Sequence, residues 1–234
     1  LALDVIPKSG WPRPQGDAMV ANLDTIFPEI EASRKMGYVQ GVNNVTLKSP
    51  IANPTKIIAA PANYMDHVVE AREDAEINFG RDIKTIDDYG LFLKANSALV
   101  GPGEGIRLSH TDRRNDHEIE LAMIIGRTAK GVAYEDALDY VAGYAIGLDN
   151  TLRGVEDRSL RKSLNSYAVL GPWMTTADEI ENPDDLSFRL TVNDEVRQDS
   201  NTKYLIFDCR KLIEYASRFY TLFPGDIIMT GTPE

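Results

Sequence analysis

The chain has 234 residues, of which 43% are hydrophobic and 26% charged, so it can bury the core of one domain, or of one domain with an extension. Asp and Glu number 36 against 25 Lys and Arg, and the net charge of -11 repels nucleic acid. The apolar runs are shorter than the roughly 20 residues that cross a bilayer. No secretory signal opens the sequence, and the single Cys209 cannot form an internal disulfide, so we expect a cytosolic protein without a membrane partner.

Residues 1–54 are loosely patterned. Pro12 and Pro14 mark turns, and residues 18–36 have the apolar spacing of an amphipathic helix. We therefore expect an N-terminal extension over residues 1–54 and a principal domain over residues 55–234.

Short strands dominate the principal domain, and helices interrupt them without the regular alternation of a doubly wound sheet. The sequence therefore predicts a strand-rich α+β fold. Two helices are expected over residues 135–141 and 208–220, with Asp208 as the N-cap of the second. Strands are expected at residues 56–60, 91–94, 105–108, 118–125, 144–148 and 226–229, with a hairpin of 186–192 and 196–198.

The strand predicted over residues 118–125 carries two acidic side chains on one face. The two-residue period of a strand places Glu118 and Glu120 together, with Cα atoms about 7 Å apart, while apolar residues cover both faces. Two buried carboxylates repel each other and lose hydration, so they need a cation or strong hydrogen-bond donors. An acidic pair is common in so acidic a chain, so this pattern alone is weak.

A third carboxylate, Asp149, ends the apolar strand at residues 144–148. Strand ends commonly present functional groups, although Asp149 could instead cap the turn at Asn150. Three carboxylates without His or Cys ligands suit Mg²⁺, Mn²⁺ or Ca²⁺ better than zinc, because hard cations prefer oxygen.

Several motifs then follow one another in an order that resembles the fumarylacetoacetate hydrolase family. The resemblance covers roughly residues 55–234 and implies a mixed β-sheet roll or barrel, like the C-terminal domain of that family. It also implies a homodimeric, divalent-metal-dependent enzyme that acts on small 2-oxo acids in the catabolism of aromatic compounds. The matching segments are residues 62–70, 91–94, 116–122, 143–153, 162–173 and 225–234.

The resemblance assigns roles to individual positions. Glu118, Glu120 and Asp149 become the metal ligands, with Mg²⁺ as the expected ion and Mn²⁺ or Ca²⁺ as alternatives. Lys162 becomes a positive charge beside the metal that helps to hold the substrate or its enolate. Arg153 and Thr232 become substrate contacts, and His67 and Glu70 become the dyad that activates water. The three-residue spacing of this dyad fits one face of a helix in a segment expected to close as a lid.

Without the resemblance, these residues have simpler interpretations. Residues 153–162 would be a solvated charged face, His67 and Glu70 an ordinary surface pair, and Lys94 a structural residue.

The sequence also departs from the family at several positions. Glu156 stands where a Gln often helps to bind substrate, and Asn165 stands where an Asp is common. Residues 74–88 predict an extended lid. Since family members continue beyond the position of Glu234, we also expect the family's C-terminal strands to be absent from the sequence given.

The chemistry implied by the resemblance is hydrolysis of a C–C bond in an acylpyruvate-type 2-oxo acid, through a metal-stabilised enolate. Two alternatives remain open at this point. One is an enzyme that decarboxylates, isomerises or tautomerises its substrate, which would be oxaloacetate or a dienedioate. These reactions need the same enolate but no attacking water. The other is a non-catalytic binding protein of the same fold.

Overall fold

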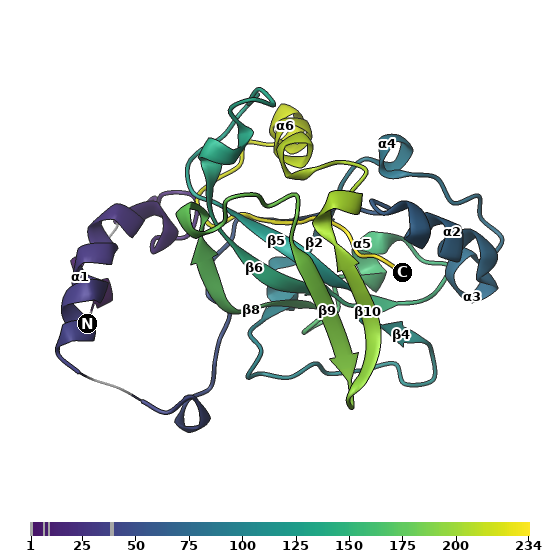
Figure 1. Cartoon of the computed structure of the whole chain (residues 1–234), viewed down its shortest axis with the longest axis horizontal. Coiled ribbons are helices and arrows are strands. Elements are labelled where there is room, and N and C mark those ends of the chain that lie inside the picture. Colours follow the sequence, from purple (N-terminus) through teal and green to yellow (C-terminus); the bar gives the residue numbers. More distant parts are fainter. Residues whose placement is uncertain (1, 7, 9, 38–39) are drawn as a thin grey trace.

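A curled, mixed sheet of seven strands forms the centre of the computed structural model, which describes residues 2–6, 8, 10–37 and 40–234 (Figure 1). The strand order is β2-β1-β11-β5-β6-β8-β3. The pairs β1/β11 and β3/β8 are parallel, and the other neighbours are antiparallel. The seven strands are β1 (Ile57–Ala59), β2 (Phe92–Lys94), β3 (Leu99–Val100), β5 (Ile119–Ile125), β6 (Val141–Asp149), β8 (Ala168–Thr176) and β11 (Ile227–Met229).

Two small antiparallel sheets and six α-helices complete the described part of the chain. The hairpin β9/β10 confirms the predicted pairing of residues 186–192 with 196–198. The second small sheet pairs β4 with β7. The remaining strands are β4 (Asn115–Asp116), β7 (Thr151–Leu152), β9 (Ser187–Val192) and β10 (Glu195–Asn201). The helices are α1 (Leu23–Lys35), α2 (Met65–Glu73), α3 (Ala75–Asn78), α4 (Ile86–Tyr89), α5 (Arg158–Arg161) and α6 (Cys209–Phe219).

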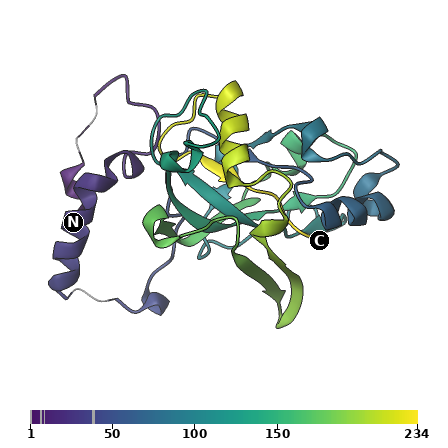
Figure 2. The same ribbon diagram turned by 45° about the horizontal axis from the view of Figure 1, so that its top comes forward.

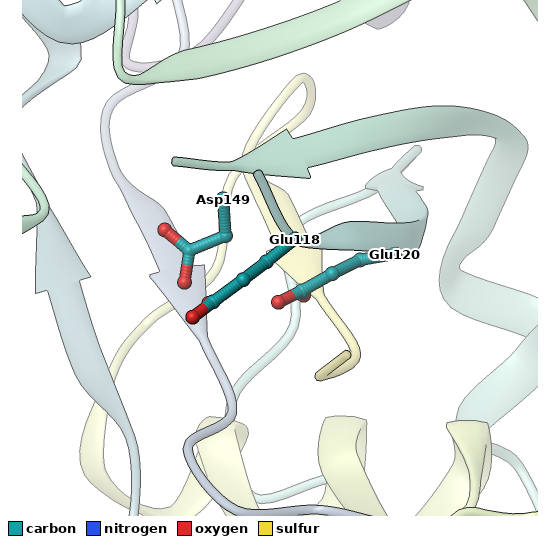
Figure 3. Close-up of side chains that lie close together, drawn as sticks. All are labelled: Glu118, Glu120 and Asp149. Atoms are coloured by element: carbon teal, nitrogen blue, oxygen red, sulfur yellow. The ribbon is translucent and has the colours of Figure 1, made fainter. Parts of the chain in front are cut away.

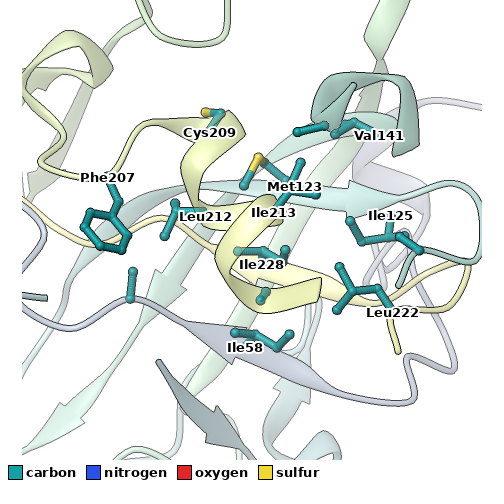
Figure 4. Close-up of a cluster of buried hydrophobic side chains, with 14 of the residues drawn as sticks. Ile58, Met123, Ile125, Val141, Phe207, Cys209, Leu212, Ile213, Leu222 and Ile228 are labelled. Atoms are coloured by element: carbon teal, nitrogen blue, oxygen red, sulfur yellow. The ribbon is translucent and has the colours of Figure 1, made fainter. Parts of the chain in front are cut away.

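All seven residues of β5 are buried, because both faces of this strand are covered. Leu121, Met123 and Ile125 belong to the hydrophobic cluster that α6 covers. Figure 4 shows Met123 and Ile125 in this cluster. Ala122 and Ile124 belong to a second cluster on the opposite face. The predicted two-residue alternation is therefore confirmed, and it fixes which face the acidic side chains of this strand share.

The helix predicted over residues 18–36 of the N-terminal segment is broadly confirmed. A short 3-10 turn, Val20–Asn22, leads into α1, which lies to one side of the sheet in Figures 1 and 2. Val20 is buried in the core, and the backbone N–H of Asp17 donates to the carbonyl of Pro224 at 2.7 Å. Residues 1, 7, 9, 38 and 39 of the predicted extension lie outside the described residues.

The structure corrects two predictions of secondary structure and adds the long strand β8, which was not predicted. Residues 105–108 form no strand, because Ile106 and Leu108 are 40% and 50% exposed and no neighbouring strand pairs with them. The helix predicted over residues 135–141 is only a 3-10 turn, Ala137–Tyr140. Strand β8 was not predicted, since Gly171-Pro172 interrupts its pattern and a proline cannot donate to a ladder.

The helix predicted over residues 208–220 is confirmed as α6. Its N-cap is Asp208, whose Oδ1 accepts a hydrogen bond from the backbone N–H of Lys211 at 2.7 Å. None of the helices in the described part of the chain has the length and apolar character needed to cross a bilayer.

Candidate metal and catalytic site

The structure brings Glu118, Glu120 and Asp149 together where the start of β5 lies beside the end of β6. Glu118 directly precedes β5 and Asp149 ends β6, and the antiparallel register joins them through a 2.9 Å hydrogen bond between the Asp149 N–H and the Glu118 carbonyl. One oxygen from each of the three carboxylates lies within 4.8 Å of the other two (Figure 3). The three residues are only 4%, 1% and 1% exposed, so their charges are removed from water.

Two lysines neutralise part of this charge. The Nζ of Lys162, directly after α5, lies 2.5 Å from Glu118 Oε2 and 2.6 Å from Asp149 Oδ2. The ammonium of Lys94, at the end of β2, pairs with the other oxygen of Asp149. Lys94 was predicted only as a structural residue, although a lysine within an otherwise apolar strand was a signal that it meets a buried anion.

The surroundings shift the pKa values of Glu118 and Glu120 in opposite directions. Against the effect of burial, the charges of Lys162 and Arg153 lower the pKa of Glu118. Burial and the neighbouring Asp149 raise the pKa of Glu120 well above its usual value, although the backbone N–H of Gly231 donates to its Oε2 at 2.7 Å. Lys94, Lys162 and Arg153 pair with Asp149 and Glu118, and within the described residues no ion pair reaches Glu120, so this third carboxylate lacks a cationic partner.

These side chains fit a divalent cation. The site offers three carboxylate oxygens that are already close together, and no His or Cys side chain belongs to this cluster of described residues. Such an oxygen-only set suits hard cations such as Mg²⁺, Mn²⁺ and Ca²⁺.

The two predicted substrate contacts border the same pocket. Arg153 donates from Nε to Asp116 at 2.7 Å and from Nη2 to Glu118 at 3.0 Å, while its Nη1 has no hydrogen bond within the described residues. Thr232 is buried, and its Oγ1 accepts a hydrogen bond from Gln198 Nε2 at 2.8 Å. The side-chain oxygen of Gln198 also accepts a hydrogen bond from the N–H of Ile119 at 2.8 Å. Gln198, which was not predicted, therefore connects the β9/β10 hairpin to the start of β5 and to Thr232.

His67 and Glu70 lie on one face of α2, as their spacing predicts. The Nδ1 of His67 is 2.9 Å from Glu70 Oε2. His67 is also part of the pocket wall that contains the three carboxylates and Lys162. This pocket encloses a cavity of about 160 Å³, which suits a small organic acid rather than a polymer.

Glu156 is turned away from the pocket. Arg113 donates to both of its carboxylate oxygens, at 3.0 and 2.8 Å, and also to the carbonyl of Arg153. A Cβ atom at Gly154 would lie 1.7 Å from Arg113 Nη2, so glycine leaves the space that the guanidinium occupies. The other departure from the family, Asn165, is exposed.

Comparison with known proteins identifies the family of the chain. The family described as "Fumarylacetoacetate (FAA) hydrolase C-terminal" matches residues 56–234. A maleylpyruvate hydrolase of Aquipseudomonas alcaligenes is 53% identical over 235 residues, which cover 100% of this chain and 82% of that protein. A mitochondrial oxaloacetate tautomerase of Xenopus laevis is 36% identical over 197 residues, which cover 82% of this chain but 59% of the relative.

A solved structure is also similar. It is the maleylpyruvate hydrolase of Sphingobium sp. SYK-6 in complex with manganese(II) and pyruvate, with a TM-score of 0.78 and 39% identity. The superposition covers 92% of this chain and 74% of that one. The chain therefore belongs to the fumarylacetoacetate hydrolase family, and it is an enzyme of that family.

Proposed function

We propose that this enzyme hydrolyses a C–C bond of an acylpyruvate, a small 2-oxo acid. The observation that carries the proposal is that one pocket is lined by the three carboxylates, Lys162 and His67, and that Glu70 Oε2 lies 2.9 Å from the Nδ1 of His67. The maleylpyruvate hydrolase that is 53% identical, and the bound manganese and pyruvate of the Sphingobium protein, support it.

Glu118, Glu120 and Asp149 would hold the divalent cation, with Mg²⁺ as our first choice and Mn²⁺ or Ca²⁺ as alternatives. When bound, such a cation supplies Lewis-acid stabilisation to the negative charge that develops on a 2-oxo acid as its C–C bond breaks.

The protein's own groups account for the remaining steps. Arg153 and Thr232 hold the substrate carboxylate, and His67, oriented by Glu70, removes a proton from water as the water attacks the distal carbonyl. The C–C bond next to that carbonyl then breaks. One product is a carboxylic acid, and the other is the enolate of pyruvate, whose charge Lys162 stabilises until a proton converts it to pyruvate.

A turnover assay with Mg²⁺ or Mn²⁺ tests this function. We expect release of pyruvate from at least one acylpyruvate, measured by a coupled lactate dehydrogenase reaction.

The second candidate, an oxaloacetate tautomerase or decarboxylase or a dienedioate isomerase, is favoured by the 36% identity to the Xenopus protein. Turnover of oxaloacetate or a dienoate without pyruvate release from any acylpyruvate would select it instead.

The Lys162→Ala variant tests the site within the same assay. Loss of one preorganised charge contact should lower kcat/KM about 10²–10³-fold. Metal affinity, measured by calorimetry, should stay largely intact, because the three carboxylates remain. Unchanged kinetics in a folded variant would assign Lys162 to charge compensation alone.

We also propose that the enzyme is a homodimer, as the family resemblance implies. Trp173 and Ile146, on neighbouring strands β8 and β6, are 66% and 41% exposed, and an apolar surface of this kind suits a protein contact. Light scattering should give the mass of two chains. A mass of one chain at micromolar concentration would reject the dimer.

A further inference from the structure

The hairpin β9/β10 projects from the central sheet in Figures 1 and 2. Most of β10 is exposed, but Gln198 is only 7% exposed and lies between the exposed residues Arg197 and Asp199. The pairing register shifts between Val196 and Gln198, which marks a β-bulge at Arg197. A bulge redirects the side chains around it, and a buried glutamine needs hydrogen-bond partners for its amide. The fold therefore places this one amide of the hairpin in the interior.

Three hydrogen bonds fix the orientation of the Gln198 amide. Its Oε1 accepts from the backbone N–H of Ile119 at 2.8 Å. Its Nε2 donates to the Pro233 carbonyl at 2.9 Å and to Thr232 Oγ1 at 2.8 Å. A backbone N–H only donates and a carbonyl only accepts, so exchanging the oxygen and nitrogen of the amide would break both backbone contacts. The nitrogen of the amide must therefore face Thr232.

The fixed amide also determines the role of the Thr232 hydroxyl. An amide nitrogen only donates, so Thr232 Oγ1 is the acceptor and its own proton points elsewhere. Within the described residues, this hydroxyl donates to no other group. Thr232 is 4% exposed and lines the pocket of the three carboxylates and Lys162. A buried hydroxyl proton without an acceptor in the protein favours a ligand that supplies one.

We propose that Gln198 is a positioning residue that turns the hydroxyl proton of Thr232 toward the pocket, where it donates to the carboxylate of a 2-oxo acid. The inference rests on the proposed function and deepens it, because it assigns the direction of one hydrogen bond to the substrate and the residue that sets this direction. Without a fixed amide, the hydroxyl would present either its proton or its lone pairs to the ligand. A fixed donor in a pocket that Arg153 also lines favours an anionic group over a neutral one.

Gln198 has a competing role, because its amide also ties the hairpin to the start of β5. A tether alone predicts that ligand affinity falls with the number of hydrogen bonds lost, and two variants separate these roles. Gln198→Met removes all three hydrogen bonds but leaves the Thr232 hydroxyl free to rotate and donate. Gln198→Glu keeps an acceptor for the Ile119 N–H, but its carboxylate accepts from Thr232 and so draws the proton away from the pocket.

Calorimetric titration of the Mn²⁺-loaded protein with pyruvate compares the two variants. We expect Gln198→Glu to weaken pyruvate binding about 10–100-fold, because the lone pairs of Thr232 then face the carboxylate of the ligand. Gln198→Met should weaken binding less than about 5-fold, because its hydroxyl is still a donor. Urea denaturation checks that both variants are folded. A tether predicts the reverse order, since Gln198→Met loses more contacts.

Thr232→Val completes a double-mutant cycle. In this background Gln198→Glu should weaken pyruvate binding less than about 3-fold further, because no hydroxyl proton remains to be redirected. Val196→Glu is the matched control, since it adds the same charge to β10 at a residue that is 50% exposed, and it should change the affinity less than about 2-fold. An undiminished effect of Gln198→Glu in the Thr232→Val background would overturn the proposal. Weaker pyruvate binding by Gln198→Met than by Gln198→Glu would do the same.

Kinetics separate this inference from the hydrolase assignment. If an acylpyruvate is cleaved, Gln198→Glu should raise its KM about 10–100-fold and change kcat less than about 3-fold, because the carboxylate contact is made equally in the ground state and the transition state. A loss in kcat alone would contradict the positioning role. If no acylpyruvate is cleaved, the proposed function fails, but the order of the pyruvate affinities still tests this inference. A wild-type protein that does not bind pyruvate would reject the hydrogen bond from Thr232.

Discussion

At the scale of single residues, His67 distinguishes hydrolysis from the other enolate reactions. We expect His67→Ala to abolish pyruvate release from an acylpyruvate, because no other imidazole lies on α2 beside the pocket to activate water. Oxaloacetate decarboxylation needs no activated water, so the variant should keep part of that activity wherever the wild-type enzyme has it. Equal loss of both activities would show that His67 binds substrate rather than activating water. Glu70→Gln, which keeps a hydrogen-bond acceptor beside His67, should give a smaller loss.

Lys94 gives a second prediction for a single residue, this time in stability. Its ammonium and the carboxylate of Asp149 are both buried, so Lys94→Met leaves an anion without one of its partners. We expect about 3–5 kcal/mol less unfolding free energy in metal-free protein, measured by urea denaturation.

Divalent metal should restore part of the stability lost in Lys94→Met, because a cation would again balance Asp149. Lys203→Met is the control, because Lys203 is exposed over the Tyr204 ring, and its change should stay within about 0.5 kcal/mol. An unchanged unfolding curve for Lys94→Met would mean that Lys162 alone balances Asp149.

The sequence predicted part of this site, and the reason is local geometry. Glu118 and Glu120 share a strand face by a two-residue period, and Asp149 ends the next predicted strand, so their proximity needed only adjacent pairing of two strands. Gln198 lies outside the family motifs. Its contacts with Ile119 and Thr232 depend on how the β9/β10 hairpin packs against β5, which a sequence pattern does not determine.

At the scale of elements, a secondary structure was predicted correctly where its local sequence signals agree with its packing, and incorrectly where packing overrides those signals. Helix α6 has a cap at Asp208 and a continuous apolar face, so its local signals agree with its packing. Residues 105–108 alternate as a strand does, but a strand also needs a neighbour, and none lies beside this stretch within the described residues.

Glu156, in the loop after β7, gives a prediction on how the unfolding free energy depends on pH. The hydrogen bonds from Arg113 lower the pKa of Glu156 from its usual 4.5 to about 2. A carboxylate with a lowered pKa in the folded state stabilises the fold above pH 4.5, and this contribution is lost as pH falls toward 2. The wild-type unfolding free energy should therefore fall more steeply over this interval than that of Glu156→Gln.

Acid titrations followed by urea denaturation measure this difference. Glu181→Gln, at an exposed residue without an ion pair in the described part of the chain, should follow the wild-type curve. Parallel curves for Glu156→Gln and wild type would show that the ion pair with Arg113 adds nothing to stability.

At the scale of the whole molecule, the buried acidic site should couple metal binding to global stability. A ligand that binds only the folded state adds about 2.7 kcal/mol at a concentration 100 times its Kd. We therefore expect Mn²⁺ or Mg²⁺ to raise Tm and excess chelator to reverse the change, measured by scanning calorimetry. Glu120→Gln, which keeps an acceptor for the Gly231 N–H, should lose most of this gain. An equal gain in both proteins would indicate diffuse binding to the acidic surface.

The position of β11 in the sheet affects how the whole chain folds. β11 lies between β1 and β5, so Ile57, near the start of the family match over residues 56–234, pairs with Ile227. A central strand that comes so late in the sequence leaves β1 and β5 without their shared neighbour until the ribosome has made residues 227–229. Native pairing of this sheet is therefore expected only after nearly all of residues 1–229 have been synthesised, and the high sequence separation of these contacts should make refolding slow.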